Sequence, residues 1–291
     1  MSSPPSLRLW PDTATILERS RGVFLAHWEE IIRLRRATLK SMTPDDIHDL
    51  RVASRRFRAV LELLYPFVAK GPKTELRKKI RKLTQVLGGI RNIDEAQRFF
   101  PLFVNAETST ESKLFCALSE MRTKEFIRIK KVLKDFELRK LDKIVRETVA
   151  EVNDDAIKKR NSISLLAYFS DVSIRQYLSI HCLLGAAVVP ERRTSLHALR
   201  IAIKKWRYFF EIITQILGCN YSRTLEILKV YQTILGQMND IAEFEILLAN
   251  LKLSRDERVN AKAILKVEDS VLLTRLTELI ERKPLVYTFL I

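Results

Sequence analysis

The sequence has few residues that interrupt helices. Only seven glycines and nine prolines occur in 291 residues, and no segment shows the apolar–polar alternation of a half-buried β-strand. Apolar side chains instead recur every three or four residues, the spacing of one face of an α-helix. The sequence therefore predicts an all-α protein, with helices over 13–41, 45–69, 73–105, 111–134, 138–152, 162–188, 194–217, 221–251 and 256–282.

Cysteines and long apolar runs are scarce as well. Cys116, Cys182 and Cys219 lie far apart and form no Cys-x-x-Cys pair, which suits a reducing compartment better than a disulfide framework. The first residues lack the apolar core of a secretory signal. The longest apolar stretch, 177–189, is well below the ~20 residues that span a bilayer. We expect a cytoplasmic protein that does not insert into membranes.

Motifs for phosphate chemistry are missing. No Gly-x4-Gly-Lys-Ser/Thr loop occurs, which argues against nucleotide hydrolysis by that route. The His-Asp dipeptide at His48 is of the kind that binds metal in phosphohydrolases, but no second histidine or acidic triad lies close to it in sequence. We therefore expect no metal, no cofactor and no catalytic residues. The chain has only four histidines, His27, His48, His181 and His197.

Acidic side chains are too few to balance the basic ones. The chain has 51 Lys and Arg against 35 Asp and Glu, a formal net charge of +16, which favours anionic partners. Residues 1–150 hold 31 basic and 19 acidic side chains, whereas residues 151–291 hold 20 and 16. We therefore expect a positively charged face that is weighted toward the first half.

One segment occurs twice, 149 positions apart. His-Asp-Leu-Arg-Val-Ala-Ser-Arg-Arg-Phe-Arg at 48–58 aligns with His-Ala-Leu-Arg-Ile-Ala-Ile-Lys-Lys-Trp-Arg at 197–207. Glu62 and Glu211 fall in the same register. Further along, 87–93 aligns with 235–241 at an offset of 148. A duplicated helical hairpin with a one-residue difference in its loop explains both alignments.

The repeated segment predicts an amphipathic helix with a basic row. At about 100° per residue, the row covers an arc of roughly 80° opposite the apolar face. Like charges one turn apart destabilise a helix by a few tenths of a kcal/mol per pair, so the return of the row in the second repeat favours a functional site over a solvated surface. The two rows are His48, Arg51, Arg55, Arg58 and His197, Arg200, Lys204, Arg207.

Basic residues continue beyond the two rows. The hairpin partner at 73–82 carries Arg77, Arg81 and Lys82 among others. A further cluster at 122–134 fits an ordinary exposed face equally well. The aromatic residues near the basic rows, Phe57, Trp206, Tyr208 and Phe209, suggest base stacking, but Phe57 and Trp206 lie on the apolar faces, which favours core packing for them. Arginine and lysine in linear array match a linear chain of phosphates, and histidine adds a donor that can gain charge beside an anion.

These repeated blocks resemble the CHAD family, the conserved histidine α-helical domain, whose hallmark helix is H-x-L-R-x-A-x-[RK]-[RK]-x-R in each half. The Leu-Gly pairs at 87–88 and 235–236, followed by Arg91-Asn92-Ile93-Asp94 and Asn239-Asp240, resemble the family's second motif. The resemblance runs from residue 12 to the C-terminus. The E-x-E-x-K signature of the triphosphate-tunnel module that often accompanies this domain is absent, so a fused triphosphatase is not expected.

The resemblance implies one compact domain, made of two pseudo-symmetric helical bundles around a central basic groove. Residues 1–11 would be an N-terminal extension, and 12–291 would hold two repeats, about 12–152 and 162–288. It also implies non-catalytic binding of inorganic polyphosphate and association with polyphosphate granules. The matched positions predict polyphosphate-binding residues at His48, Arg51, Arg55, Arg56, Arg58, Arg77, Arg81, Lys82, His197, Arg200, Lys204, Lys205 and Arg207.

Departures from the family pattern point to an asymmetric site. Asn92 stands where the family more often has aspartate, and residues 221–235 carry only two basic side chains, Arg223 and Lys229. Two other functions fit the same basic surface: nucleic-acid binding, which would respond to the same charges, and a scaffold role. No helix-turn-helix, zinc finger or RNA-binding motif occurs, and polyphosphate is the preferred partner.

Overall fold

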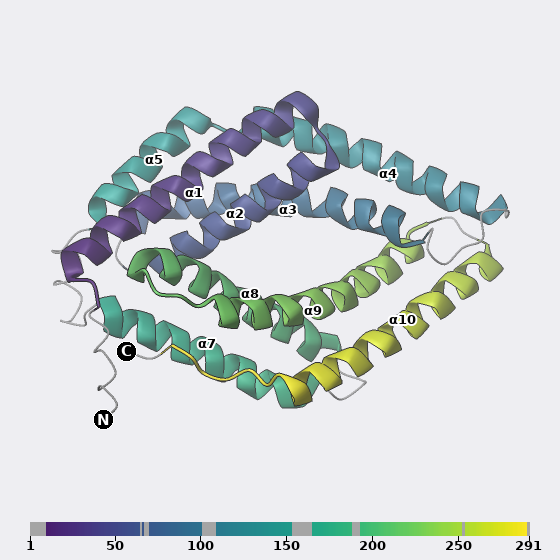
Figure 1. Ribbon diagram of the computed structural model, residues 1–291. Coiled ribbons are helices and arrows are strands. Elements are labelled where there is room, and N and C mark those ends of the chain that lie inside the picture. Colours follow the sequence, from purple (N-terminus) through teal and green to yellow (C-terminus); the bar gives the residue numbers. More distant parts are fainter. Residues whose placement is uncertain are drawn as a thin grey trace.

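The computed structural model describes residues 10–64, 66, 70–100, 109–152, 165–187, 193–251 and 254–289 (Figure 1). These residues form helices and connecting segments, with no β-strand among them. The predicted all-α class is confirmed. The helices are α1 Thr13–Ser41, α2 Pro44–Leu64, α3 Lys70–Phe99, α4 Ser109–Lys134, α5 Leu138–Glu151, α7 Leu165–Ala187, α8 Arg193–Leu217, α9 Ser222–Ala249 and α10 Arg255–Arg282.

The predicted helices 45–69 and 73–105 run well past the ends of α2 and α3, and proline explains both differences, whereas 138–152 and 221–251 differ from α5 and α9 by one or two residues at an end. Helix α2 ends at Leu64 and α3 at Phe99, each two residues before a proline, Pro66 and Pro101. A proline disfavours helical geometry in the residue before it and cannot donate its own backbone hydrogen bond. The predicted stretches 67–69, 101–105 and 162–164, with residues 65 and 188, lie outside the described residues.

Side-chain caps define several helix starts. The backbone N–H of Thr15 donates to Asp12 Oδ1 at 2.7 Å before α1, and that of Asp46 donates to Thr43 Oγ1 at 3.2 Å before α2. A capping box between Ser254 and Glu257 begins α10. Each cap satisfies a backbone donor that has no partner within its helix.

The helices of the two halves pack in the same order. In the first half α1 packs on α2, α2 on α3 and α3 on α4, while in the second half α7 packs on α8, α8 on α9 and α9 on α10. The halves meet where α2 and α1 contact α8, and where α3 contacts α9 (Figure 1). The two helices with the repeated basic rows are therefore neighbours. The predicted boundary between the repeats falls within 153–164, outside the described residues.

Aromatic side chains at matching positions of the repeat anchor both cores. Phe57 is fully buried, with its ring centroid 5.1 Å from that of Phe24 and 5.5 Å from that of Trp28. Trp206 is also fully buried, 5.2 Å from the ring of Phe210. The expected core role of Phe57 and Trp206 is confirmed. Their burial fixes the rotation of α2 and α8, which turns the basic rows away from the core.

None of the described helices is long and apolar enough to cross a lipid bilayer.

Candidate functional site

The basic rows of α2 and α8 converge at the contact between the halves. On α2, the buried side chains of Leu50, Ala53 and Phe57 face the core, whereas Arg51 and Arg55 are half-buried on another side of the helix. Helix α8 repeats this arrangement with apolar residues toward its own core. Because α2 and α8 are in contact, the two rows lie against each other rather than on separate surfaces.

Five basic side chains from three helices form one cluster, named here the cation cluster. Arg51 lies within electrostatic range of Arg55, Arg91 and Arg200. Lys204 lies within range of the same residues and of Arg51 itself. Two members come from α2, one from α3 and two from α8. The cluster consists of Arg51, Arg55, Arg91, Arg200 and Lys204.

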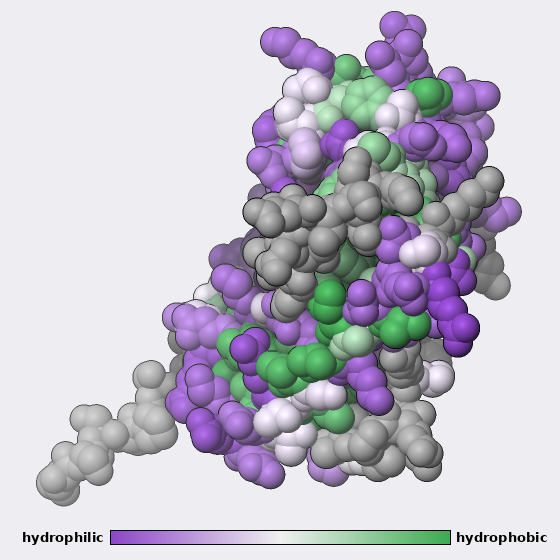
Figure 2. All heavy atoms as spheres, turned by 90° about the vertical axis from the view of Figure 1, so that its right-hand side faces the viewer, coloured by the Kyte–Doolittle hydropathy of each residue, from purple (hydrophilic) through white to green (hydrophobic). Residues whose placement is uncertain are grey.

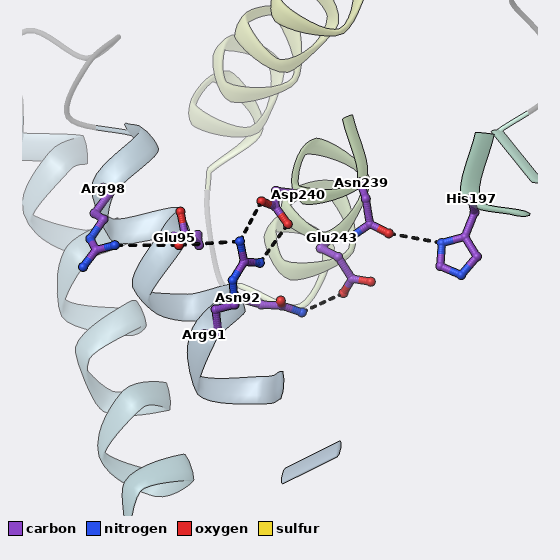
Figure 3. Close-up of polar contacts among 8 residues, drawn as sticks. All are labelled: Arg91, Asn92, Glu95, Arg98, His197, Asn239, Asp240 and Glu243. Atoms are coloured by element: carbon purple, nitrogen blue, oxygen red, sulfur yellow. Dashed lines mark hydrogen bonds and ion pairs between the residues drawn. The ribbon is translucent and has the colours of Figure 1, made fainter. Parts of the chain in front are cut away.

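Only one member of the cation cluster forms an ion pair within the described residues, although the charges of Asp240 and Glu243 also act on Arg200. Arg91 Nη1 and Nη2 lie 3.1 and 3.3 Å from the two carboxylate oxygens of Asp240 (Figure 3), and Glu95 is 3.6 Å away. Within the described part of the chain, the other four cluster members have no ion pair. The Nε atoms of Arg51 and Arg200 are buried and make no hydrogen bond. Unpaired buried charge is unfavourable unless an opposite charge is supplied.

Burial and mutual repulsion lower the pKa values within the cluster. Burial, followed by the charge of Arg55, lowers the pKa of Arg51 to about 9 and that of Arg200 to about 10. The same causes lower the pKa of Lys204 to about 5. Lys204 is only 6% exposed, so water does little to stabilise its ammonium form. Its amine is therefore uncharged at neutral pH, while the arginines remain charged.

An open groove of about 560 Å³ runs beside the cluster, between α2, α7 and α8. Among the described residues, Glu62 is the only carboxylate that lines it. One part of the lining is basic and another is apolar. The basic lining residues are Arg55, Arg58, Arg175, Lys204 and Lys205, and the apolar and aromatic ones are Ala59, Leu63, Tyr168, Val172, Ile201, Tyr208, Phe209 and Ile212.

Two glutamates neutralise the outer members of the predicted rows. Glu62 lies 3.7 Å from Arg58 and 3.9 Å from Arg77. Glu211 receives Arg207 at 2.9 Å and Arg56 at 3.2 Å. Both glutamates follow their rows at the same repeat position. The last arginine of each row, Arg58 or Arg207, is therefore paired with a glutamate, whereas the basic residues in the middle of the rows have no such ion pair.

Two predicted polyphosphate-binding residues, Arg56 and Arg207, lie away from the groove because both pair with Glu211. Arg56 lines a neighbouring cavity of about 340 Å³, together with His27 and Glu211. Burial and the charge of Arg56 lower the pKa of His27, which favours its neutral form. Arg207 also donates to Gln232 Oε1 at 3.0 Å.

The two repeated histidines flank the cluster without lining the groove. Both are exposed. His48 borders a cavity of about 190 Å³ that Arg91 also lines. His197 Nδ1 lies 3.1 Å from Asn239 Oδ1 (Figure 3) and borders a small cavity with Arg200. Each histidine therefore sits next to one member of the cation cluster.

The predicted binding residues on α3 contribute less to the site than those on α2 and α8. Arg77, Arg81 and Lys82 are exposed on α3, and none of them lines the groove or the cavity beside His48. The exposed lysines of α4, such as Lys130 and Lys131, are on a helix that packs against α3 and α1 and supplies no groove residue.

The sequence did not predict Arg91 and Arg175 as site residues. Arg91 aligns with Asn239 in the second repeat, so it does not belong to a repeated pair of basic residues. Arg175 reaches the groove from α7 and pairs with Asp171 one turn earlier. Its helix is the least polar of the chain, and no basic pattern draws attention to it. Only the packing of α3 and α7 against α2 and α8 reveals either residue.

Polar contacts between α3 and α9 hold the halves together behind the cluster. Besides the Arg91–Asp240 pair, Asn92 Nδ2 donates to Glu243 Oε2 at 3.0 Å (Figure 3). Arg91 is thus held in place by an acid from the other half. Among the described residues, no group of three or more His, Cys, Asp or Glu side chains could hold a metal ion.

We predict that Lys204 makes the stability of the protein depend on pH. The folded-state pKa of about 5 lies below the ordinary value of 10.5, so between these values the unfolded chain binds more protons at this site. The free energy of unfolding therefore rises with pH across that window, and the penalty is complete below pH 5. Lys204→Met should flatten the slope by up to about 1 kcal/mol per pH unit between about pH 6 and 9.

Urea unfolding at several pH values measures this slope. Lys205→Met is the matched control, because Lys205 is the next residue on α8 and is exposed. An unchanged slope in Lys204→Met, or an equal change in both variants, would contradict the prediction.

Comparison with known proteins agrees with this fold. Residues 22–249 match the CHAD domain family. The structure is similar to a crystal structure of the CHAD domain from the plant Ricinus communis, with 19% identity, a TM-score of 0.70 and 98% of each chain covered. It is also similar to PptA from Streptomyces chartreusis, with 14% identity, a TM-score of 0.64 and coverage of 91% of this chain and 99% of that one. No curated protein matches the chain. The family match covers more than three quarters of the sequence, and the chain belongs to the CHAD domain family.

Proposed function

We propose that this protein binds inorganic polyphosphate in the groove between α2, α7 and α8 and does not cleave it. The observation that carries the proposal is the cation cluster, in which only Arg91, of five basic side chains, forms an ion pair within the described residues. The CHAD family is associated with polyphosphate. A chain of phosphoryl groups would supply the negative charge that the cluster lacks.

The groove suits a linear polyanion. Arginine guanidinium groups can bind phosphate oxygens through two parallel hydrogen bonds, which gives both strength and orientation. The rows repeat every helical turn, about 5.4 Å, so successive side chains can engage successive parts of one phosphate chain. Arg55, Arg58 and Lys204 line the groove itself, while Arg51 and Arg200 stand behind it and add to its positive potential.

Binding without cleavage fits the lining of the groove. Phosphoryl transfer to water needs a group that positions or deprotonates the attacking water. Glu62 is the only carboxylate among the described lining residues, and its ion pairs with Arg58 and Arg77 favour a structural role. We assign the site a binding role, and association with polyphosphate granules would follow from it.

Nucleic acid is the second candidate for the same charges. A single strand is usually held by aromatic side chains on which bases stack. Phe57, Trp206 and Phe209 are buried, whereas Tyr168 and Tyr208 are half-buried in the groove lining, so the width of the ligand separates the two candidates better than stacking does. Duplex DNA carries its phosphates on the outside of a wide cylinder, whereas a phosphate chain is narrow enough to enter a groove of about 560 Å³.

We predict that the protein prefers long-chain polyphosphate to duplex DNA of equal charge. Competition between labelled polyphosphate and unlabelled DNA measures this at ~0.15 M salt, where the Debye length is about 8 Å and exposed charges are largely screened. Polyphosphate should displace DNA at a much lower concentration of phosphate than the reverse. Equal affinities would show that only overall charge is recognised, and the assignment would fail.

We predict that reversing two cluster charges weakens polyphosphate binding strongly. Arg51→Glu combined with Arg200→Glu should raise the dissociation constant at least ~100-fold, because the two reversals replace positive with negative charge beside the groove and remove much of its positive potential. Lys130→Glu with Lys131→Glu on α4 changes the net charge equally and is the matched control. A similar loss in both variants, measured by fluorescence titration, would show that the cluster has no special role.

We predict that polyphosphate binding is coupled to proton uptake by Lys204. An anion beside the cluster offsets the burial and repulsion that lower the pKa of Lys204, so the bound state takes up a proton and affinity rises as pH falls. Calorimetry at about pH 8 in two buffers of different ionisation enthalpy should give up to about one proton per protein molecule. Lys204→Arg, which stays charged, should remove this uptake; an unchanged value would refute the coupling.

A further inference from the structure

The groove between α2, α7 and α8 has accessible apolar side chains that inorganic polyphosphate would leave uncovered. Ile201 is 40% exposed, and the other four are half-buried: Ala59, Tyr168, Val172 and Tyr208. These five lining residues are named here the apolar wall. A chain of bare phosphates has no apolar surface to place against this wall. The polyphosphate proposal therefore accounts for the basic part of the lining and not for the apolar part.

The lining changes from basic to apolar along α2. Arg55 belongs to the cation cluster, and Leu63 lies eight residues further on, a distance of ~12 Å along the helix. The backbone carbonyl of Leu63 accepts a hydrogen bond of 2.9 Å from the hydroxyl of Tyr168, which brings α7 to this apolar end. On α7 itself, Arg175 follows Tyr168 by two turns. A ligand lying along the groove therefore meets positive charge in one part and apolar side chains in another.

Two tyrosines of the apolar wall favour a flat ring as the apolar part of that ligand. Tyr168 comes from α7 and Tyr208 from α8. The hydrogen bond from the hydroxyl of Tyr168 to Leu63 holds its ring in one orientation. Tyrosine rings stack on other flat rings, and every nucleobase offers such a face. The groove thus combines the two kinds of contact that a phosphorylated nucleoside needs.

Charge distinguishes the apolar wall from other exposed apolar side chains of the molecule. The face in Figure 2 shows hydrophobic side chains in a band across its lower half, and α10 exposes Val259 and Val267. Nothing in the structure shows what covers those valines. The apolar wall instead shares its groove with five basic residues and lies next to the cation cluster, so its ligand must carry negative charge as well as an apolar part.

We infer that the groove also binds nucleoside polyphosphates such as ATP, with the phosphates at its basic residues and the base on the apolar wall. This inference rests on the proposed function, because the same basic residues would hold the phosphates of either ligand. The groove volume of about 560 Å³ falls within the range of small-molecule sites, roughly 300–1,000 Å³. Because both ligands use the same residues, a nucleoside polyphosphate competes with inorganic polyphosphate for the groove.

The position of the charges favours a free nucleotide over a nucleic-acid strand. A nucleoside polyphosphate carries its negative charges on adjacent phosphates at one end, whereas a strand carries one charge on each nucleotide along its length. The basic side chains of the groove are likewise concentrated, since Arg55 and Lys204 lie next to Arg51, Arg91 and Arg200. A compact group of phosphates matches this concentration of positive charge better than the evenly spaced phosphates of a strand.

Calorimetric titration of the wild type with ATP and with tripolyphosphate, both without Mg²⁺, tests this inference. The two ligands have the same number of phosphates, so tighter binding of ATP reports the nucleoside. The dissociation constant of ATP should be at least ~10-fold lower, because one stacked base raises affinity roughly 5- to 150-fold. Equal or weaker binding of ATP overturns the nucleotide inference and leaves polyphosphate binding intact. If long-chain polyphosphate does not bind, the proposed function fails and the inference fails with it.

Substitutions of Tyr208 test the contact with the base. Tyr208→Leu keeps an apolar side chain but removes the ring, so the preference for ATP over tripolyphosphate should fall at least ~5-fold. Tyr208→Phe keeps the ring and should keep the preference. A preference that Tyr208→Leu leaves unchanged would contradict the inference. Geranyl diphosphate and ADP have the same number of phosphates, and tighter binding of geranyl diphosphate would show that the wall accepts an aliphatic chain, which also overturns the inference.

Discussion

Electrostatic repulsion among Arg51, Arg55, Arg91, Arg200 and Lys204 is the constraint on which this structure depends. These side chains come together because α2 and α8 are in contact and each is turned with its apolar face toward its own core. Burial, and after it the charges of the neighbouring arginines, lowers the pKa of Lys204 to about 5. A fold that holds such a cluster must offset its cost through packing elsewhere, and an anion beside the cluster would lower that cost, which supports the proposed binding of polyphosphate.

Acidic side chains around the cluster limit the repulsion among its members but do not remove it. Glu62 and Glu211 pair with arginines at the ends of the rows, and Asp240 pairs with Arg91 across the contact between α3 and α9. The large aromatic residues Phe57 and Trp206 keep α2 and α8 from rotating away from each other. Acids therefore surround the cluster while its centre, beside the groove, keeps an excess of positive charge.

The two halves contribute differently to this arrangement. The first half supplies three arginines to the cluster, whereas the second supplies Arg200 and a largely neutral Lys204. In the α3–α9 contact the first half supplies Arg91 and the second supplies the acid, Asp240. The site is therefore asymmetric, as expected, because the two halves contribute different charges. Among these charges, that of Lys204 is the one most open to change.

The sequence by itself determined the helices, the duplication and the two basic rows, because helical periodicity and repeated residue types are local properties of the chain. It also placed Phe57 and Trp206 in the core. Only the tertiary structure decided which cations face one another, that Arg56 is directed to Glu211, and that Arg91 belongs to the cluster. Those outcomes depend on how α2, α3, α7 and α8 pack, and distances between helices far apart in sequence leave no periodic signal in any one segment.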